Sequence, residues 1–220
     1  MPDPDLRERV AATARRLAAA GLLIGTAGNV SARAGDRIAV TGTGVVLGEC
    51  TAETVTEVSP DGEIRAGRLR PTSELDLHLG IYRDTGAGAV VHTHAPDSTA
   101  VACLAGLTAL PVLHYQQLLL GGDIPIAPFA PFGTPELAAH VRAALVGKQA
   151  ALLANHGAVA LGDTLDKALE NALLLEWAAA LFAKTTAMGS PRVLTADEQA
   201  AVVEQAIRLR YGTIQENPHG

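Results

Sequence analysis

The sequence of 220 residues is poor in aromatic side chains, in cysteine and in positive charge. Phe, Trp and Tyr together make up 3 % of the chain, so a hydrophobic core has to be built mainly from Ala, Leu and Val. The two cysteines, Cys50 and Cys103, provide neither a disulfide framework nor a metal-binding spacing, which favours reduced thiols in the cytoplasm. The net charge of −6 and the lack of a basic stripe argue against nucleic acid and anionic membranes as partners.

Long hydrophobic runs are also missing. Gly or a polar residue interrupts every apolar run before it reaches the ~18 residues that a membrane-spanning helix requires. The opening segment MPDPDLRERV is charged and has no apolar stretch, so we do not expect a secretory signal peptide. Yet 48 % of the residues are hydrophobic and 18 % are charged, which is typical of a folded chain. Since no linker, repeat or low-complexity segment occurs, we expect a single domain over residues 1–220.

Hydrophobic spacing predicts helices that alternate with short strands, and this alternation predicts an α/β domain whose central sheet is covered by helices. A glycine-rich turn is expected at 25–33, and Thr134 with Pro135 is expected to begin a helix. The expected helices cover residues 5–20, 73–85, 98–104, 134–146, 165–187 and 197–209. The expected strands cover residues 37–41, 89–94, 150–154 and 159–162, with two more short strands around a Pro-Asp-Gly turn within 55–64.

Two histidines separated by one residue lie at the end of the expected strand 89–94, in the segment AVVHTHAPD. Side chains two residues apart on a strand share a face, so His92 and His94 can converge on one cation at about 2.1 Å each. His156, in LLANHGAVAL, repeats the pattern of an apolar strand, a histidine and a glycine. Each histidine alone is compatible with an ordinary strand end, but three together are typical of an open catalytic zinc site. His78 lacks this placement, and its position favours packing over support of the site.

A second group of residues is typical of an anion site. Glu74, in RPTSELDLHL, falls in the first turn of an expected helix, where a carboxylate often only complements the helix dipole. Thr72 and Ser73, candidate caps of this helix, offer hydroxyl and backbone N–H groups to an anion, which would then lie beside Glu74. The pairs Gly28-Asn29 and Thr43-Gly44 offer similar donors, although each is also compatible with a plain turn. Neither pair matches the long phosphate loop or the dinucleotide-binding fingerprint.

Taken in order, these segments resemble the class II aldolase/adducin family, and within it the L-fuculose-phosphate aldolases. The resemblance extends over nearly the whole chain without large gaps, and the combination of segments is more specific than any one of them. The segments are GTAGNVSAR (25–33), TGTGV (41–45), PTSELDLHLGIYR (71–83), VVHTHAPDSTAVACL (90–104), LPVLHYQQLLLGGDIPIAPFAPFGTPEL (110–137) and LLANHGAVALGDTLDKAL (152–169).

The resemblance implies a role for each matching residue. His92, His94 and His156 match the zinc ligands of the family. Glu74 matches its catalytic acid/base, which also coordinates the metal before the substrate arrives. Tyr115, in LHYQQ, matches a catalytic tyrosine that the family contributes across a subunit boundary. The positions that match the family's phosphate-binding residues are Gly28, Asn29, Thr43, Gly44, Thr72 and Ser73.

The resemblance also implies a fold, an assembly and an activity. The fold is a single-domain α/β/α sandwich with a central, mostly antiparallel sheet. The assembly is a cytoplasmic homotetramer with active sites at the subunit interfaces and one Zn²⁺, or another divalent metal, per subunit. Tyr211, in RLRYGT, resembles a mobile tyrosine that closes over the site. The implied activity is that of an aldehyde-lyase, which cleaves a ketose 1-phosphate such as L-fuculose 1-phosphate into dihydroxyacetone phosphate and an aldehyde through a metal-stabilised enediolate.

Three alternatives stay open at this point. A 4-epimerase or dehydratase can use the same scaffold, but epimerases of the family carry an acidic residue near the position of Tyr115, and LHYQQ has none. A decarboxylase, or an aldolase for another sugar phosphate such as a deoxypentulose phosphate, fits the same residues. A non-catalytic adducin-like domain is disfavoured, because such domains lose the metal ligands that this chain retains.

Overall fold

A computed structural model describes residues 6–212 of the chain. Within these residues, nine strands form one sheet in the order β4-β3-β2-β1-β5-β9-β8-β7-β6, and only the β7–β8 pair is parallel. The expected mixed α/β fold with a mostly antiparallel sheet is therefore confirmed. The strands are β1 (Asn29–Ala34), β2 (Arg37–Thr41), β3 (Val55–Val58), β4 (Ile64–Ala66), β5 (Ala89–Thr93), β6 (Ala109–Leu110), β7 (Ile124–Ala127), β8 (Ala150–Leu153) and β9 (Gly157–Gly162).

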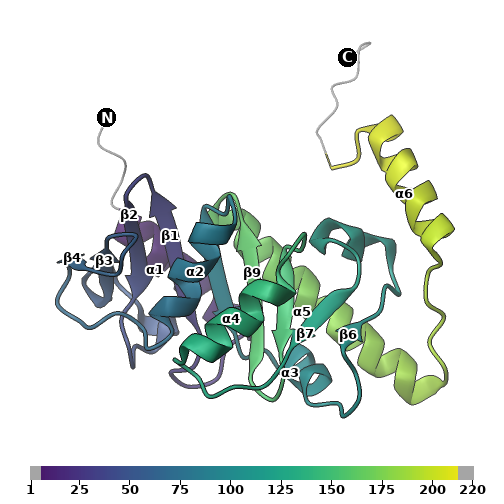
Figure 1. Ribbon diagram of the computed structural model, residues 1–220, viewed down its shortest axis with the longest axis horizontal. Helices are drawn as coiled ribbons and strands as arrows, with labels where there is room; N and C mark the ends of the chain where they lie inside the picture. Colours follow the sequence, from purple (N-terminus) through teal and green to yellow (C-terminus); the bar gives the residue numbers. More distant parts are fainter. Residues whose placement is uncertain (1–5, 213–220) are drawn as a thin grey trace.

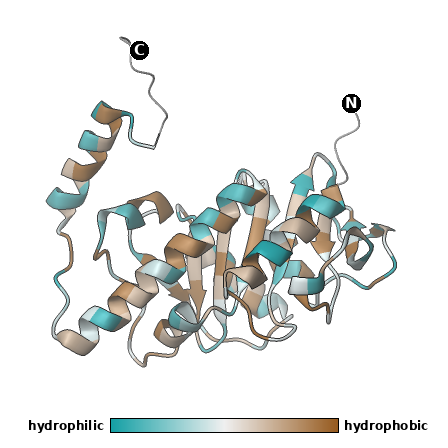
Figure 2. Ribbon diagram, turned by 180° about the vertical axis from the view of Figure 1, so that it is seen from behind, coloured by the Kyte–Doolittle hydropathy of each residue, from teal (hydrophilic) through white to brown (hydrophobic). Residues whose placement is uncertain are grey.

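Helices cover both faces of the sheet. Helices α2 and α4 lie on the face toward the viewer in Figure 1, and the long helix α5 crosses the opposite face, which Figure 2 shows from behind. Helix α6 stands apart from the sheet and contacts the short 3₁₀-helix η3. The helices are α1 (Leu6–Ala19), α2 (Leu75–Asp84), α3 (Pro96–Ala102), α4 (Pro135–Ala144), α5 (Leu165–Met188) and α6 (Ala196–Leu209), and the 3₁₀-helices are η1 (Leu47–Glu49), η2 (Ala52–Thr54) and η3 (Tyr115–Leu120).

The sheet separates two hydrophobic cores built mainly from Ala, Leu and Val, as the low aromatic content predicts. On β5, Ala89 and Val91 join the core beneath α1, α3 and α5, whereas Val90 joins the core beneath α2 and α4. Since side chains alternate between the two faces of a strand, His92 lies on the same face as Val90. The site histidine thus faces α2, on a strand whose residues are all buried.

Strand β1 occupies most of the segment for which a glycine-rich turn was expected, so that prediction is wrong after residue 28. The strand pairs with both β2 and β5 in the middle of the sheet. Its residues Val30 and Ala32 enter one core, while Asn29 and Ser31 are buried toward the opposite face. The alternation was hidden because the buried polar residues are small and therefore look like turn residues.

Strands β6 and β7 and the 3₁₀-helix η3 were not expected from the sequence. Pro125 lies inside β7, and proline normally argues against a strand because it cannot donate a hydrogen bond to its neighbour. The strand is short and pairs with β8 through Ile126 and Ala127, after the proline. Tertiary pairing thus stabilised a strand that local propensity disfavours.

The expected helix starts are confirmed at α4 and corrected at α2. The Thr134 hydroxyl accepts a hydrogen bond from the Leu137 backbone N–H at 3.2 Å, and Pro135 occupies the first turn. At α2 the cap position belongs to Glu74 rather than to Thr72 or Ser73. The Thr72 hydroxyl instead accepts from the Glu74 backbone N–H at 3.3 Å, which leaves the Glu74 side chain free to turn toward the sheet.

No helix within residues 6–212 is both long enough and apolar enough to cross a membrane. Residues 1–5, which belong to the charged opening segment and include the first residue of the expected helix 5–20, lie outside the described residues. The expectation of a single domain over residues 1–220 stays a prediction.

Candidate active site

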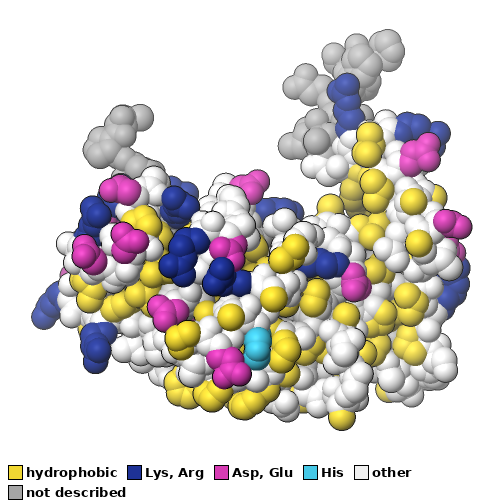
Figure 3. Space-filling model, in the orientation of Figure 1, with side chains coloured by type: hydrophobic (Ala, Val, Ile, Leu, Met, Phe, Trp, Pro, Cys, Tyr) yellow, Lys and Arg dark blue, Asp and Glu magenta, His cyan; other side chains and the backbone are white. Residues whose placement is uncertain are grey.

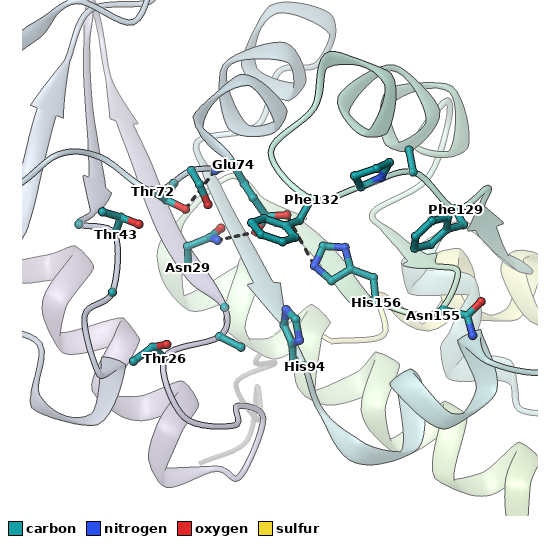
Figure 4. A pocket seen from close by; sticks show the side chains of 17 residues that line it. Thr26, Asn29, Thr43, Thr72, Glu74, His94, Phe129, Phe132, Asn155 and His156 are labelled. Carbon is teal, nitrogen blue, oxygen red and sulfur yellow. Dashed lines mark hydrogen bonds and ion pairs between the residues drawn. The ribbon is translucent and has the colours of Figure 1, made fainter.

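A cavity of about 620 Å³ lies where the chain leaves β2 and β8 and enters β1 and α2. In the view of Figure 4, Thr43 and Thr72 lie on one side of this cavity, Phe129 and Asn155 on the other, and the histidines between them. The structure brings together all six residues that the family resemblance assigns to phosphate binding. They are Gly28, Asn29, Thr43, Gly44, Thr72 and Ser73.

The three predicted metal-binding histidines form a compact cluster. Strand β5 delivers His92 and His94, and the turn between β8 and β9 delivers His156. One nitrogen of each ring lies within 4.8 Å of the corresponding nitrogens of the other two, and the His92 and His94 Nε2 atoms are 2.9 Å apart. His92 is fully buried, and its Nδ1 lies 3.0 Å from the Ala158 carbonyl oxygen. Because a carbonyl only accepts, Nδ1 carries a proton, and Nε2 is the nitrogen of His92 that points into the cluster.

The β8–β9 turn has the backbone needed to present His156 to this cluster. Asn155 adopts the left-handed conformation with φ 55°, which asparagine tolerates better than most residues. The His156 backbone N–H then donates to the Leu153 carbonyl at 3.0 Å and closes the turn. At Gly157, a Cβ atom would lie 2.3 Å from the Thr93 carbonyl oxygen, so a larger residue would push β9 away from β5. The glycine after the histidine therefore keeps His156 close to the other two rings.

Glu74 reaches the cluster from the start of α2 and is almost fully buried. Its Oε2 accepts a hydrogen bond from the Asn29 Nδ2 group at 2.9 Å and lies 3.2 Å from the His92 Nε2 atom. Its Oε1 lies 3.7 Å from the His156 Nε2 atom and has no hydrogen-bond partner among residues 6–212. A buried carboxylate oxygen without a partner is costly, which indicates that a cation or a substrate group completes this site.

The charges and lone pairs of the cluster fit a divalent cation. Burial lowers the pKa of His94 to about 4 and that of His156 in the same direction, with the neighbouring His92 ring adding to both effects, so both rings are neutral at pH 7. Burial alone would raise the pKa of Glu74, but His92, the Asn29 hydrogen bond and His156 lower it overall, so the carboxylate is ionised. Neutral imidazoles and a carboxylate are ligands that zinc prefers, so the donor set of this cluster fits a divalent cation.

The side of the cavity away from the histidines is rich in hydrogen-bond donors and free of basic side chains. Among the residues that line it, none is Lys or Arg, and Thr26, Thr43, Thr72 and Ser73 contribute hydroxyl groups. Gly28 has a φ of +91°, and a Cβ atom there would lie 2.9 Å from the His92 carbonyl oxygen. Glycine is required at this position because the loop passes directly over β5. A phosphate bound here would be held by backbone N–H and hydroxyl groups rather than by cations.

Tyr115 and Tyr211 lie away from this cavity. Both side chains are exposed, at 40 % and 52 %, and their hydroxyl oxygens are 3.4 Å apart. Together with α6 they line a second, apolar cavity of about 400 Å³. Within one chain, the structure therefore does not bring Tyr115 together with Glu74.

Two phenylalanines of the cavity were missed in the sequence. Phe129 and Phe132 line it and are 62 % and 70 % exposed. Exposed apolar side chains that lie side by side at a cavity are typical of ligand-binding or interaction sites, whereas single exposed ones are not informative. In a chain with only three phenylalanines, the repeated APF in APFAPFGT was the available signal.

A family model described as "Class II Aldolase and Adducin N-terminal domain" matches residues 8–183, which is most of the chain. The chain belongs to the class II aldolase and adducin family. A curated relative from Rhodospirillum rubrum, named 5-methylthioribulose-1-phosphate/5-deoxyribulose-1-phosphate aldolase, is 40 % identical over 202 residues, which are 91 % of this chain and 90 % of the relative. An L-fuculose phosphate aldolase from Escherichia coli K12 is 38 % identical over 209 residues, which are 94 % of this chain and 95 % of the relative.

The fold of this class II aldolase family member is also that of a solved relative. A structure named L-fuculose 1-phosphate aldolase superposes with a TM-score of 0.87 at 29 % sequence identity. The match covers 93 % of this chain and 97 % of the solved chain. The resemblance inferred from the sequence is therefore confirmed, and the histidine cluster of this chain is consistent with a divalent metal ion.

Proposed function

We propose that this class II aldolase is a zinc-dependent lyase that cleaves a ketose 1-phosphate, similar to L-fuculose 1-phosphate, into dihydroxyacetone phosphate and an aldehyde. One observation carries the proposal. The ionised Glu74 carboxylate, with one buried oxygen lacking a partner, faces three histidines at the edge of a cavity rich in hydrogen-bond donors. The R. rubrum and E. coli relatives are both named as aldolases of ketose 1-phosphates, which supports the same class of substrate.

In this proposal, the donor-rich side of the cavity binds the phosphate. Backbone N–H groups at Gly28 and Gly44 and the hydroxyls of Thr43, Thr72 and Ser73 hold its oxygens without a basic side chain. A fixed phosphate places the reacting carbons over the histidine cluster, and such positioning contributes a large part of enzymatic rate enhancement.

His92, His94 and His156 would hold the metal ion, and Glu74 lies close enough to join them before the substrate enters. A bound divalent ion would supply Lewis-acid polarisation of the substrate ketone. Three neutral histidines leave the positive charge of the ion undiminished and keep a coordination position open. The choice of zinc rests on this donor set and is part of the proposal.

Glu74 transfers the proton at carbon 3 of dihydroxyacetone phosphate. In the direction of condensation, the ionised carboxylate takes this proton, and the electron pair of the broken C–H bond forms the new bond to the aldehyde carbon. Cleavage runs through the same steps in reverse. General acid–base help of this kind contributes about 10²- to 10⁴-fold in rate.

In this proposal the protein is a homotetramer, and Tyr115 of a neighbouring subunit transfers the proton to or from the aldehyde oxygen. Its exposure, and its position outside the cavity of its own chain, support a role in another chain's site. Tyr211 lies beside it on the same surface and would close over the shared site. The cytoplasmic location expected from the sequence stays part of this proposal.

A second candidate substrate is a 5-methylthio- or 5-deoxypentulose 1-phosphate. Part of the cavity wall is apolar and consists of Phe129, Ala130, Pro131 and Phe132. In Figure 4, Phe129 lies on the side opposite Thr43 and Phe132 lies between Asn29 and His156, and this wall would accommodate an aldehyde with an apolar end. The R. rubrum relative is named for these substrates. Contact with an apolar wall favours a methyl or methylthio group over an additional hydroxyl group, because the hydroxyl would lose hydrogen bonds to water.

The deciding experiment is a screen of ketose 1-phosphates with coupled detection of dihydroxyacetone phosphate, with and without a chelator. L-Fuculose 1-phosphate, 5-methylthioribulose 1-phosphate and 5-deoxyribulose 1-phosphate are compared at equal concentration, with Glu74→Gln as the matched control for each. Metal-dependent release from one of them supports the proposal and identifies the substrate class. Epimerised or decarboxylated product without dihydroxyacetone phosphate would replace the proposed reaction with one of the alternatives.

A further inference from the structure

A buried ladder of polar side chains connects α2 with β1 behind the cavity. Glu74, His78 and Tyr82 recur every four residues along α2 and face Asn29 and Ser31 of β1, two residues apart. Four helical residues rise about 6.0 Å and two strand residues rise about 6.8 Å, so the two sets stay in step. All five residues are less than 7 % exposed.

The ladder is a continuous chain of hydrogen bonds. Asn29 Nδ2 bonds to Glu74 Oε2 at 2.9 Å, and Asn29 Oδ1 bonds to His78 Nε2. Ser31 Oγ lies 2.7 Å from His78 Nδ1 and 2.7 Å from the Tyr82 hydroxyl oxygen. Asn29, His78 and Ser31 therefore each bond to two neighbours of the ladder, and the donor or acceptor role in one bond limits the role in the next.

Only one assignment of donors and acceptors satisfies every hydrogen bond of the ladder. The Glu74 carboxylate only accepts, so Asn29 presents its NH₂ group to it and its carbonyl oxygen to His78. His78 must then carry its proton on Nε2, and its Nδ1 accepts from the Ser31 hydroxyl. Ser31 in turn accepts from Tyr82. Burial lowers the pKa of His78 to about 3, so the ring stays neutral and can serve as donor and acceptor at once.

We propose that His78 is a positioning residue, which holds the Asn29 amide in the single orientation that donates to Glu74 Oε2. The Oε1 atom is thereby left as the free oxygen that faces His156 and the substrate. A flipped Asn29 would aim its carbonyl oxygen at the carboxylate and push it away. The catalytic part of this inference rests on the proposed role of Glu74, whereas the hydrogen-bond order does not.

The first test measures the His78 tautomer directly. Nitrogen-15 NMR of histidine-labelled protein, with the His78 signals assigned by their loss in His78→Gln, reports which ring nitrogen carries the proton. We expect the Nε2–H form at pH 7.5, with and without added Zn²⁺. An Nδ1–H form or a doubly protonated ring overturns the proposal, and neither result depends on finding a substrate.

The second test separates positioning from packing. His78→Gln keeps an amide donor near the Nε2 position, whereas His78→Leu removes it, and Ile81→Val is a buried α2 control outside the ladder. We expect His78→Leu to lower kcat about 10- to 100-fold with little change in KM, and His78→Gln to recover most of the loss. Equal losses in both variants that follow their melting temperatures, or no loss in either, overturn the positioning role.

The outcomes also distinguish this inference from the proposed function. If no ketose 1-phosphate is cleaved by the wild-type protein, the proposed function fails while the NMR result still decides the order of the ladder. If His78→Leu does not fold, Ser31→Ala replaces it, because loss of the Ser31 hydroxyl frees Nδ1 of His78 and permits the other tautomer. The expected loss of kcat for Ser31→Ala is about 10-fold, and wild-type kcat overturns the proposal.

Discussion

The Glu74–histidine cluster and the Tyr115–Tyr211 surface are built in opposite ways. In the cluster, Glu74 and His92 are buried and His94 and His156 are half-buried, and three separate segments of one chain supply these residues. Its hydrogen bonds run back through β1 and α2. The tyrosine surface is exposed, and its two hydroxyls bond only weakly to each other. One chain by itself therefore brings together Glu74 and the three histidines, but it does not bring Tyr115 or Tyr211 to them.

Helix α6, which lies beside the two tyrosines, also exposes its apolar side chains. None of its residues is buried, and Val203, Ile207 and Leu209 are 45 %, 74 % and 54 % exposed. Hydrophobic side chains gather along this helix in Figure 3. Exposed apolar side chains gathered on one helix are typical of an interaction surface, so we expect α6 to contact a neighbouring subunit of the proposed homotetramer.

The largest expected effect comes from removing the metal ion or one of its ligands from the Glu74–histidine cluster. We expect His94→Ala, or stripping of the wild-type protein with a chelator, to lower kcat/KM by more than about 10³-fold, because Lewis-acid polarisation contributes several kcal/mol. Elemental analysis and release of dihydroxyacetone phosphate measure the effect, with His140→Ala as the surface-histidine control. Full activity of metal-free protein contradicts the proposal.

Glu74→Gln separates proton transfer by Glu74 from metal binding by the three histidines. We expect a loss of about 10²- to 10⁴-fold in kcat, because the amide cannot take the carbon-bound proton. Metal content should remain close to wild type, since the three histidines are unchanged. A fully active variant, measured with the substrate found in the screen, would exclude Glu74 as the acid/base.

Tyr115→Phe tests whether the exposed Tyr115 acts in the active site of another subunit. We expect a loss of about 10- to 10²-fold in kcat without loss of metal. Equal amounts of Tyr115→Phe and Glu74→Gln subunits, unfolded and refolded together, should regain about a quarter of wild-type activity if each site draws the two residues from different chains. Wild-type refolded alone is the control, and no recovery in the mixture would place both residues in one chain's site.

A charge on α6 should weaken the proposed contact between chains. We expect Ile207→Glu to dissociate the assembly at concentrations where wild type remains associated, because burying an unpaired carboxylate is costly. Sedimentation velocity over a dilution series measures this, with Glu204→Ala, a substitution of an exposed α6 residue, as control. Wild-type and Ile207→Glu proteins of identical size at every dilution would argue against α6 as the contact.

The smallest expected effect concerns the stability of the metal-free protein toward acid. The pKa values of His78 and His94 fall from 6.5 to about 3 and about 4, mainly through burial. Between pH 6.5 and pH 4 the unfolded chain therefore binds protons that the folded chain does not, and the free energy of unfolding decreases as pH falls. Above pH 6.5 these two groups add no pH dependence.

Urea midpoints at pH 7.5, 6.0 and 5.0 measure this decrease. His78→Gln is the matched control, because it removes one of the two shifted groups and should flatten the dependence. An unchanged midpoint for the wild-type protein from pH 7.5 to pH 5.0 contradicts the expected burial of the two rings.

Much of the fold and of the cavity could be predicted because the signals are local. The His-X-His pattern follows from the two-residue period of β5, and the cap at Thr134 follows from its own turn. Strand β1 was missed because Asn29 and Ser31 are buried for their hydrogen bonds rather than for their hydrophobicity. The hydrogen-bond partners of His78 were missed because they lie more than forty residues away in sequence.

The sequence by itself determined the family and the α/β alternation, and it pointed to the three histidines that cluster and to the donor residues that line the cavity, because periodicity and motifs are properties of short segments. Only the tertiary structure decided that β1 lies beside β5, that Asn29 lies between Glu74 and His78, and that Tyr115 remains outside its own cavity. These relations depend on contacts between distant segments. Such contacts form only when the two cores pack against the sheet and every buried polar group finds its partner.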